Sequence, residues 1–321
     1  MKKWSNLALG LMIGLGVVAS SQAATYRMAM VTPPTHNWTK VSEQMNTELK
    51  KINGGKNQIR IFPLSQLGTD SQVITTMQTG GVQLAVLTST SLSTRVPEFN
   101  AWSMPFIIDD IEHAYAAAKS DSGQEMLKLL ETQGLIGIGY TFAGMRQILS
   151  IKPVHSVDDF KNMKIRSVPS EVYSEFWRKL GAAPTALDPA DIISALNTNL
   201  LDAVDADFDL AVSMKYQEQA PNLVVSNHMP FPGVIVASKR WWDTLNDKDK
   251  QDIITAFENV ERWGVDQQIE AEKNNLEKLQ EDGAKIMDID ITALKDVGKQ
   301  MVEDYSAKYP LIKKFYEENK K

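Results

Sequence analysis

The hydrophobic and polar positions after Tyr26 alternate between short apolar runs and longer amphipathic segments. Apolar runs at 26–31, 58–62 and 83–87 predict three buried strands, and residues 37–52 and 69–79 show helical spacing and end at glycine pairs. Strands that alternate with helices of this length predict a parallel sheet with helices on its faces. The pattern therefore indicates an α/β fold.

The alternation continues as far as residue 238, which predicts a second α/β lobe. Further strands are expected at 135–141, 143–149, 164–168, 200–204, 222–226 and 234–238. Residues 247–283 then form one long, charge-rich helical pattern. Its apolar positions do not follow a clean heptad, so a helix that braces both lobes is favoured over a coiled-coil arm.

The first 23 residues have the pattern of a secretory signal peptide. Lys2 and Lys3 precede an apolar run at 7–19, and small residues at 21–23 predict cleavage after Ala23. The apolar run is shorter than a membrane-spanning helix needs. We therefore expect a soluble, exported mature protein, and the absence of cysteine in an exported chain favours a bacterial periplasm.

Composition argues against several classes of function. Loss of the two signal lysines leaves 32 of the 34 basic residues against 40 acidic ones, a formal charge of −8 that does not suit a nucleic acid partner. With no cysteine there is no thiolate nucleophile or cysteine metal site. The four histidines lack metal-ligand spacing, and no phosphate loop, complete dinucleotide fingerprint or nucleophile elbow is present. We expect no cofactor and no metal.

Two arginines, Arg146 and Arg166, stand within predicted strands. Because an arginine does not lose its proton, a half-buried one needs an anion from the protein or from outside it. Ligands of such sheets bind beyond the carboxyl ends of the strands, which places the loops at 32–38, 63–70 and 88–93 beside the site. These loops contribute the candidates His36, Asn37, Trp38, Gln66, Thr88 and Ser89.

A series of short motifs along the chain resembles the solute-binding proteins of TRAP transporters, the periplasmic receptors of tripartite, ion-gradient-driven importers of organic acids. The motifs are Leu67-Gly68-Thr69, Met104-Pro105-Phe106, Gly144-x-Arg146, Lys152-Pro153-Val154, Met163-Lys164-Ile165-Arg166-x-x-Pro169 and Leu180-Gly181-Ala182-x-Pro184. They cover nearly the whole mature chain in the family's order.

The resemblance implies a two-lobed periplasmic-binding-protein clamshell and a receptor that is not an enzyme. Lobe I would comprise residues 24–143 and 232–271, and lobe II residues 144–231 and 272–321, with the long helix spanning both. The residue matching Arg166 would form a bidentate salt bridge to the solute's carboxylate, and Arg146 would assist. The implied partners are a small carboxylate, either a sugar acid such as a uronate or a C4-dicarboxylate, and the membrane subunits of the importer, and a monomer is expected.

The chain departs from the family pattern in two places. Residues 189–193 replace a Phe-x-Glu-x-Tyr run, and residues 202–206 replace an Asp-Gly-Gln-Glu-Asn run. Three aspartates, Asp205, Asp207 and Asp209, cluster there. One explanation is that one of them caps the next helix, while the others are stabilised by the positive end of the helix dipole and by solvent. The other is that Asp205 or Asp207 faces the cleft, which suits a uronate, an aldonate or a zwitterion better than a plain dicarboxylate.

Two further functions stay open. The first is a periplasmic enzyme acting on a small acid, with the aspartates at 205–209 as general acid and base. The second is a sensory receptor on the same scaffold, which hands its closed form to a membrane sensor. Both retain a small organic solute as the ligand.

Overall fold

The predicted alternation of strands and helices forms the framework of the computed structural model, which describes residues 24–320. The predicted signal peptide, residues 1–23, lies outside the described residues. None of the helices within 24–320 combines the length and apolar composition that crossing a membrane requires.

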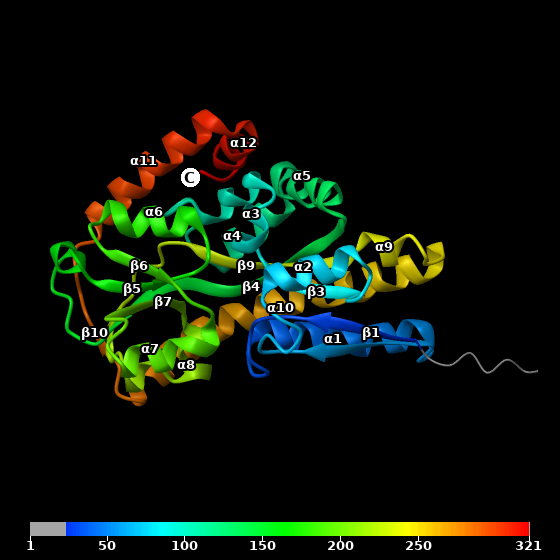
Figure 1. Ribbon diagram of the computed structural model, residues 1–321, viewed down its shortest axis with the longest axis horizontal. Coiled ribbons are helices and arrows are strands. Elements are labelled where there is room, and N and C mark those ends of the chain that lie inside the picture. Colours follow the sequence, from blue (N-terminus) through cyan, green and yellow to red (C-terminus); the bar gives the residue numbers. More distant parts are fainter. Residues whose placement is uncertain (1–23, 321) are drawn as a thin grey trace, which may run out of the picture.

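The first half of the molecule contains the three predicted parallel strands and the helices that follow them (Figure 1). Strand β1 lies between β2 and β3 and is parallel to both. Helix α1 begins where the His36 side chain accepts a hydrogen bond from the amide of Trp38, and it ends at Gly54, whose φ of 65° is readily adopted only by glycine. The elements are β1 (Ala24–Ala29), α1 (Asn37–Asn53), β2 (Asn57–Phe62), α2 (Asp70–Gln78), β3 (Leu84–Thr88), α3 (Ser89–Ser93), η1 (Pro97–Ser103), α4 (Ile111–Lys119), α5 (Asp121–Leu129) and η2 (Leu130–Gln133).

A single long strand, β4 (Leu135–Ser150), connects the first half to the second. The sequence predicts two separate runs here, at 135–141 and 143–149, and the structure joins them. The first part of β4 pairs with β9 (Pro230–Ser238), and the last part pairs with β7 (Ala203–Asp207) and β8 (Asn222–Val224), all antiparallel. The pairing with β9 shifts register between Phe142 and Met145, where Gly144 has a φ of 104°. A local bend at this glycine lets one strand serve both halves.

The second half repeats the α/β pattern with shorter elements. It contains η3 (Val157–Phe160), β5 (Lys164–Ser167), α6 (Glu171–Lys179), β6 (Ala183–Ala186), η4 (Pro189–Asp191), α7 (Ile192–Asn197), α8 (Phe208–Met214) and η5 (Tyr216–Glu218). The two helices η4 and α7 follow each other without a gap, because α7 begins at the residue after η4 ends.

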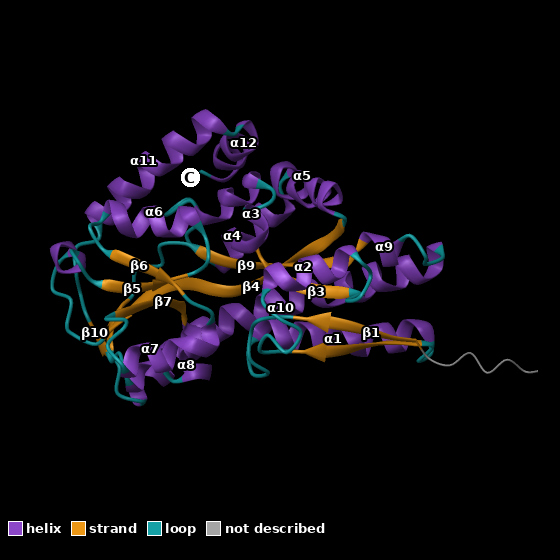
Figure 2. Cartoon of the chain, viewed as in Figure 1, coloured by secondary structure: helices purple, strands orange, loops and turns teal. Residues whose placement is uncertain are grey.

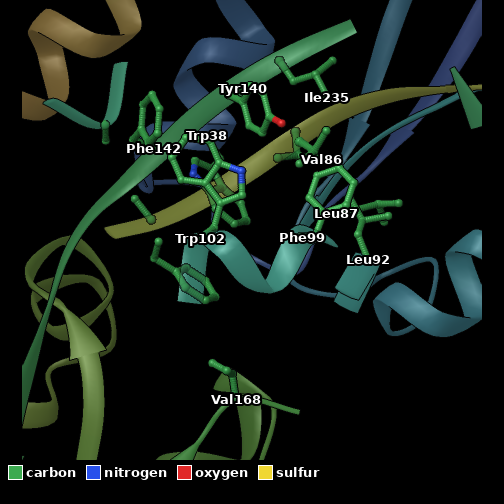
Figure 3. Close-up of a cluster of buried hydrophobic side chains, with 14 of the residues drawn as sticks. Trp38, Val86, Leu87, Leu92, Phe99, Trp102, Tyr140, Phe142, Val168 and Ile235 are labelled. Atoms are coloured by element: carbon green, nitrogen blue, oxygen red, sulfur yellow. The ribbon is translucent and has the colours of Figure 1, made fainter. Parts of the chain in front are cut away.

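The strands form one mixed sheet that runs through the molecule between two layers of helices (Figure 2). Its main order is β2-β1-β3-β9-β4-β7-β5-β6, parallel at both ends and antiparallel around β9 and β4. Part of the core lies between β4 and η1, where the Trp102 ring centre is 5.0 Å from that of Tyr140 and 6.2 Å from that of Phe142 (Figure 3). Val168 stands apart from these rings, towards the second half.

The C-terminal helices connect the halves a second time. Helix α10 (Asp247–Glu281) confirms the predicted long helix, and it packs against α1, α4, β4 and α8. It follows α9 (Lys239–Trp242) and is followed by β10 (Lys285–Ile286), α11 (Thr292–Lys308) and α12 (Pro310–Asn319). Helix α11 contacts α6 of the second half, whereas α12 contacts η1, α4 and α5 of the first. The lobe boundaries given above stay a prediction.

Phe257 anchors α10 to the central strand, so its truncation is expected to destabilise the fold. Its side chain is 2% exposed and lies directly over Gly139, where a Cβ would come within 2.2 Å of the ring. We expect Phe257→Ala to lower the free energy of unfolding by about 3–5 kcal/mol, because it leaves a cavity. Glu258→Ala, at the exposed next position, is the control for urea unfolding. Equal losses in both variants would contradict this packing role.

Candidate functional site

A cavity of about 210 Å³ lies where the two halves meet, beyond the carboxyl ends of β1, β3 and β5. This volume is below the range of drug-sized ligand sites and suits a small solute. The first half contributes Val31, Thr32, His36, Thr69, Asp70, Ser71, Thr88, Thr90 and Ser91 to its lining. The central strands and the second half contribute Arg146, Arg166, Val168, Pro169, Asp188, Pro189, Asp207, Leu210 and Phe231.

The anions that pair with Arg146 are carboxylates of the protein itself. The antiparallel register places it directly opposite Asp207 on β7, and side chains alternate along a strand, so Asp205 lies on the same face. Nε of Arg146 donates to Asp205 Oδ1 at 2.5 Å, and Nη1 donates to Asp207 Oδ2 at 3.2 Å. The guanidinium is fully buried and also lies 4.7 Å from the centre of the Phe231 ring. All three of its nitrogens donate, the third to the carbonyl oxygen of Asp205.

The aspartates in this network are held ionised. Burial alone would raise the pKa of Asp205, but the positive charge of Arg146 and hydrogen bonding with His228 outweigh burial and hold this pKa well below its usual range. The pKa of Asp207 is also lowered, because hydrogen bonding with His36 and the positive charge of Arg146 outweigh its burial. The pKa of Arg146 is raised, because its attraction to Asp205 and Asp207 exceeds the effect of burial.

Arg166 has the same burial but no such partner. Its side chain is 2% exposed, and its hydrogen bonds run from Nε to the carbonyl of Leu187 at 2.9 Å and from Nη1 to that of Asp205 at 3.1 Å. Across residues 24–320 it forms no salt bridge with a carboxylate. Burial, followed by repulsion from Arg146, lowers the pKa of Arg166 to about 10. Three of its five N–H donors therefore have no acceptor in the described chain.

The two guanidinium groups share the main-chain carbonyl of Asp205 as an acceptor. They therefore lie close together although both are positive, and of the two arginines only Arg146 is bound by the carboxylates of Asp205 and Asp207. A desolvated guanidinium with free donors is a strong site for a planar anion, because two parallel N–H groups match the two oxygens of a carboxylate. The geometry thus favours a carboxylate bound at Arg166.

The structure brings five of the ten residues predicted for the site to the cavity: Arg166, Arg146, Asp207, His36 and Thr88. Both explanations offered for the aspartates apply to Asp207, which lines the cavity and whose Oδ1 also caps α8 by accepting from the amide of Leu210 at 2.8 Å. Nε2 of His36 lies 3.8 Å from the same oxygen. Because the Trp38 amide donates to Nδ1 of His36, a neutral His36 carries its proton on Nε2, towards Asp207.

The other five predicted residues do not line the cavity. The Asp205 carboxylate is enclosed by Arg146, Trp177 and His228. Asn37 donates from its side chain to two backbone carbonyls, and Trp38, one residue further round the helix, points into the core and stacks with Phe231. The remaining two also lie away from it: Gln66 is exposed and Ser89 is buried at the start of α3.

Asp70 is a cavity residue that the sequence argument did not select. Its Oδ2 accepts from the backbone amide of Thr88 at 2.9 Å and from its hydroxyl at 2.7 Å. Its Oδ1 is buried and has no hydrogen-bond partner in the described chain. Burial, with a smaller contribution from the charge of Asp188, raises the pKa of Asp70 to about 6. The sequence did offer a signal, since Asp70 ends one of the three loops predicted to border the site.

The fold, with a small cavity between its two halves, is that of a solute receptor, and comparison with known proteins gives the same class. Residues 28–309 match the family model of the bacterial extracellular solute-binding proteins, family 7, and the chain belongs to this family. The predicted resemblance to TRAP solute-binding proteins and the predicted two-lobed α/β fold are confirmed. The family consists of solute-binding receptors rather than enzymes.

Similar proteins come from several bacteria. A TRAP periplasmic solute-binding protein from Bradyrhizobium sp. BTAi1, solved in complex with D-galacturonate, is 27% identical with a TM-score of 0.85, over 91% of this chain and 99% of that one. The sialic acid-binding periplasmic protein SiaP of Vibrio cholerae is 24% identical over 81% of each chain. The C4-dicarboxylate-binding periplasmic protein DctP of Rhodobacter capsulatus is 24% identical over 74% of this chain and 72% of its own.

The raised pKa of Asp70 predicts a pH-dependent loss of stability that Asp70→Asn removes. An unfolded aspartate titrates near 3.9, and the folded one titrates at about 6. The folded protein therefore binds this proton more tightly, and the resulting stabilisation fades as the pH rises from about 4 to about 6.

We compare the free energy of unfolding of Asp70→Asn with that of wild type at pH 4.5 and at pH 7.5. This difference should shift by about 2 kcal/mol in favour of the variant at the higher pH, because only wild type loses the stabilisation from the bound proton. Urea unfolding at the two pH values measures this gain. Asp121→Asn is the matched control, because Asp121 is also the first residue of its helix but is exposed. A difference between Asp70→Asn and wild type that does not change with pH would contradict the assignment.

Proposed function

We propose that the protein is the periplasmic receptor of a TRAP-type importer and that it binds a small sugar acid through Arg166. The observation that carries this proposal is the contrast between two buried arginines, of which only Arg146 has carboxylate partners within the described chain. A carboxylate at Arg166 would supply the missing counter-charge in a site from which water is largely excluded. The predicted signal peptide supports the periplasmic location.

Arg146 takes a positioning role in this proposal. Its hydrogen bonds hold Asp205 in place, and the carbonyl of Asp205 in turn orients Nη1 of Arg166. We expect the predicted assistance of Arg146 to act mainly through this orientation, because each of its three nitrogens already has an internal acceptor and its charge is paired with Asp205 and Asp207.

The cavity walls come from both halves of the molecule, which supports a transport cycle based on closure. A solute held by Arg166 of the second half and by hydroxyl groups of the first would stabilise the closed form through contacts to both. The closed form would then be recognised by membrane subunits of the importer. No covalent chemistry enters the cycle.

Arg166→Ala is expected to abolish most of the binding. Loss of one partner of a desolvated charge pair costs about 2–5 kcal/mol, a decrease in affinity of at least roughly 30-fold. Thermal-shift screening of residues 24–321 against sugar acids, dicarboxylates and amino acids identifies the ligands, and calorimetry then gives their affinities. A ligand at about 100 times its dissociation constant stabilises the protein by roughly 2.7 kcal/mol.

Two further variants sharpen this test. Arg166→Lys keeps the charge but loses the planar pair of donors, so we expect weak binding from it as well. Arg178→Ala removes an exposed arginine of α6 that pairs with Glu171, and it should bind as wild type does. Carboxylate binding that survives in Arg166→Ala would refute the proposal.

A further inference from the structure

Two aspartates, one from each half, line the same cavity as the arginines. We infer that Asp70 and Asp188 bind hydroxyl groups of the solute away from its carboxylate and exclude a second carboxylate. The receptor would thus select hydroxylated monocarboxylates over dicarboxylates. The inference rests on the proposed function, since it assumes that Arg166 holds the first carboxylate.

Asp70 presents a built hydrogen-bond acceptor to the cavity. It is 7% exposed, and both donors of Thr88 bind the same oxygen, Oδ2, which fixes the orientation of the carboxylate. Its other oxygen, Oδ1, is buried without a partner in the described chain. A buried carboxylate oxygen without a donor is unfavourable, and a solute hydroxyl would supply that donor.

Asp188 approaches from the second half. It precedes η4, where its side chain makes no capping hydrogen bond, and its carboxylate forms no salt bridge or hydrogen bond with residues 24–320. Its negative charge is one of the causes that raise the pKa of Asp70, so the two carboxylates interact across the cavity. It also adjoins residues 189–193, the segment that departs from the family pattern. Neither aspartate forms a salt bridge with Arg146 or Arg166, so neither carboxylate is paired with the two cations, although Asp188 directly follows Leu187, whose carbonyl accepts from Arg166.

Hydroxyl side chains surround the acidic pair. Thr32 Oγ1 is buried and has no partner among the described residues, so it is a second unsatisfied group in the lining. Thr69, Ser71, Thr90 and Ser91 also line this side. Hydroxyl groups both donate and accept, as the hydroxyls of a sugar acid do, so the two sets are complementary.

The same arrangement disfavours the two alternative solute classes. A second carboxylate would meet Asp70 and Asp188, and juxtaposed like charges in a desolvated site are strongly unfavourable. A remote ammonium group could pair with the aspartates, but it only donates hydrogen bonds and so could not satisfy the hydroxyl donors of the lining, whereas a solute hydroxyl both donates and accepts. The lining therefore fits hydroxyl groups best.

Matched pairs of sugar acids test this selectivity. D-Galactonate and galactarate differ only at the far end, where a hydroxymethyl group is replaced by a carboxylate, and D-gluconate and D-glucarate form a second pair. Calorimetry with wild type, Asp70→Asn, Asp188→Asn and Arg166→Ala gives the affinity ratio within each pair. In Asp70→Asn the amide oxygen can still accept from Thr88, while its NH₂ group replaces the free acceptor. Asp121→Asn is the control for the same chemical change at an exposed helix start.

We expect wild type to prefer the monocarboxylate of at least one pair by tenfold or more. Asp70→Asn should lower the affinity for that monocarboxylate on the order of 10- to 100-fold, because the variant loses a charge-assisted hydrogen bond to the solute. Its affinity for the dicarboxylate should not fall, so the ratio of monocarboxylate affinity to dicarboxylate affinity becomes smaller than in wild type. Asp188→Asn should shift the ratio in the same direction, and Asp121→Asn should leave it unchanged.

The outcomes separate this inference from the proposed function. If both cavity variants keep the wild-type ratio while Arg166→Ala loses binding, the acidic pair is not a selectivity device and the receptor assignment stands. Tighter binding of γ-aminobutyrate than of every sugar acid would overturn the hydroxyl assignment in favour of an ammonium site. Binding unaffected by Arg166→Ala, or no binding of any acid tested, would refute the proposed function and this inference with it.

Discussion

The central physical feature of this site is the guanidinium of Arg166, which is buried and has no carboxylate partner in the described chain. Arg146 and Arg166 are both desolvated and share one carbonyl acceptor, yet only Arg146 has carboxylate partners within the described chain. Because arginine cannot discard its charge, the protein carries at Arg166 a buried cation without a carboxylate partner in the described chain. The rest of the structure holds that cation in a cavity whose walls come from two halves.

The sheet creates this asymmetry through its register. Strand β4 is long enough to pair with β9 in the first half and with β7 in the second, and its pairing with β7 sets Arg146 opposite Asp207. Strand β5 lies on the other side of β7 and is parallel to it, so Arg166 reaches the backbone of Asp205 rather than its carboxylate. Helix α10 packs across both halves and supports the central strand.

The cavity lining also contains a buried negative charge that is unfavourable, that of Asp70. Asp70 is ionised at neutral pH at the expense of stability, because burial and Asp188 both oppose its charge. Within the described chain Arg166 lacks an anion and Asp70 Oδ1 lacks a donor, and each of these unmet requirements lowers the stability of the fold. Such unsatisfied groups are commonly retained where function needs them.

The sequence by itself determined the α/β alternation, the long bracing helix and the presence of arginines within strands, because periodicity and charge are local properties. It also located the three loops at the cavity. It did not show which arginine is paired, since that depends on the register of β4 with β7, nor that Trp38 points into the core while Asp70 points into the cavity. Those outcomes depend on contacts between residues far apart in the chain, such as Asp70 with Thr88 and Asp70 with Asp188, which only the tertiary structure brings together.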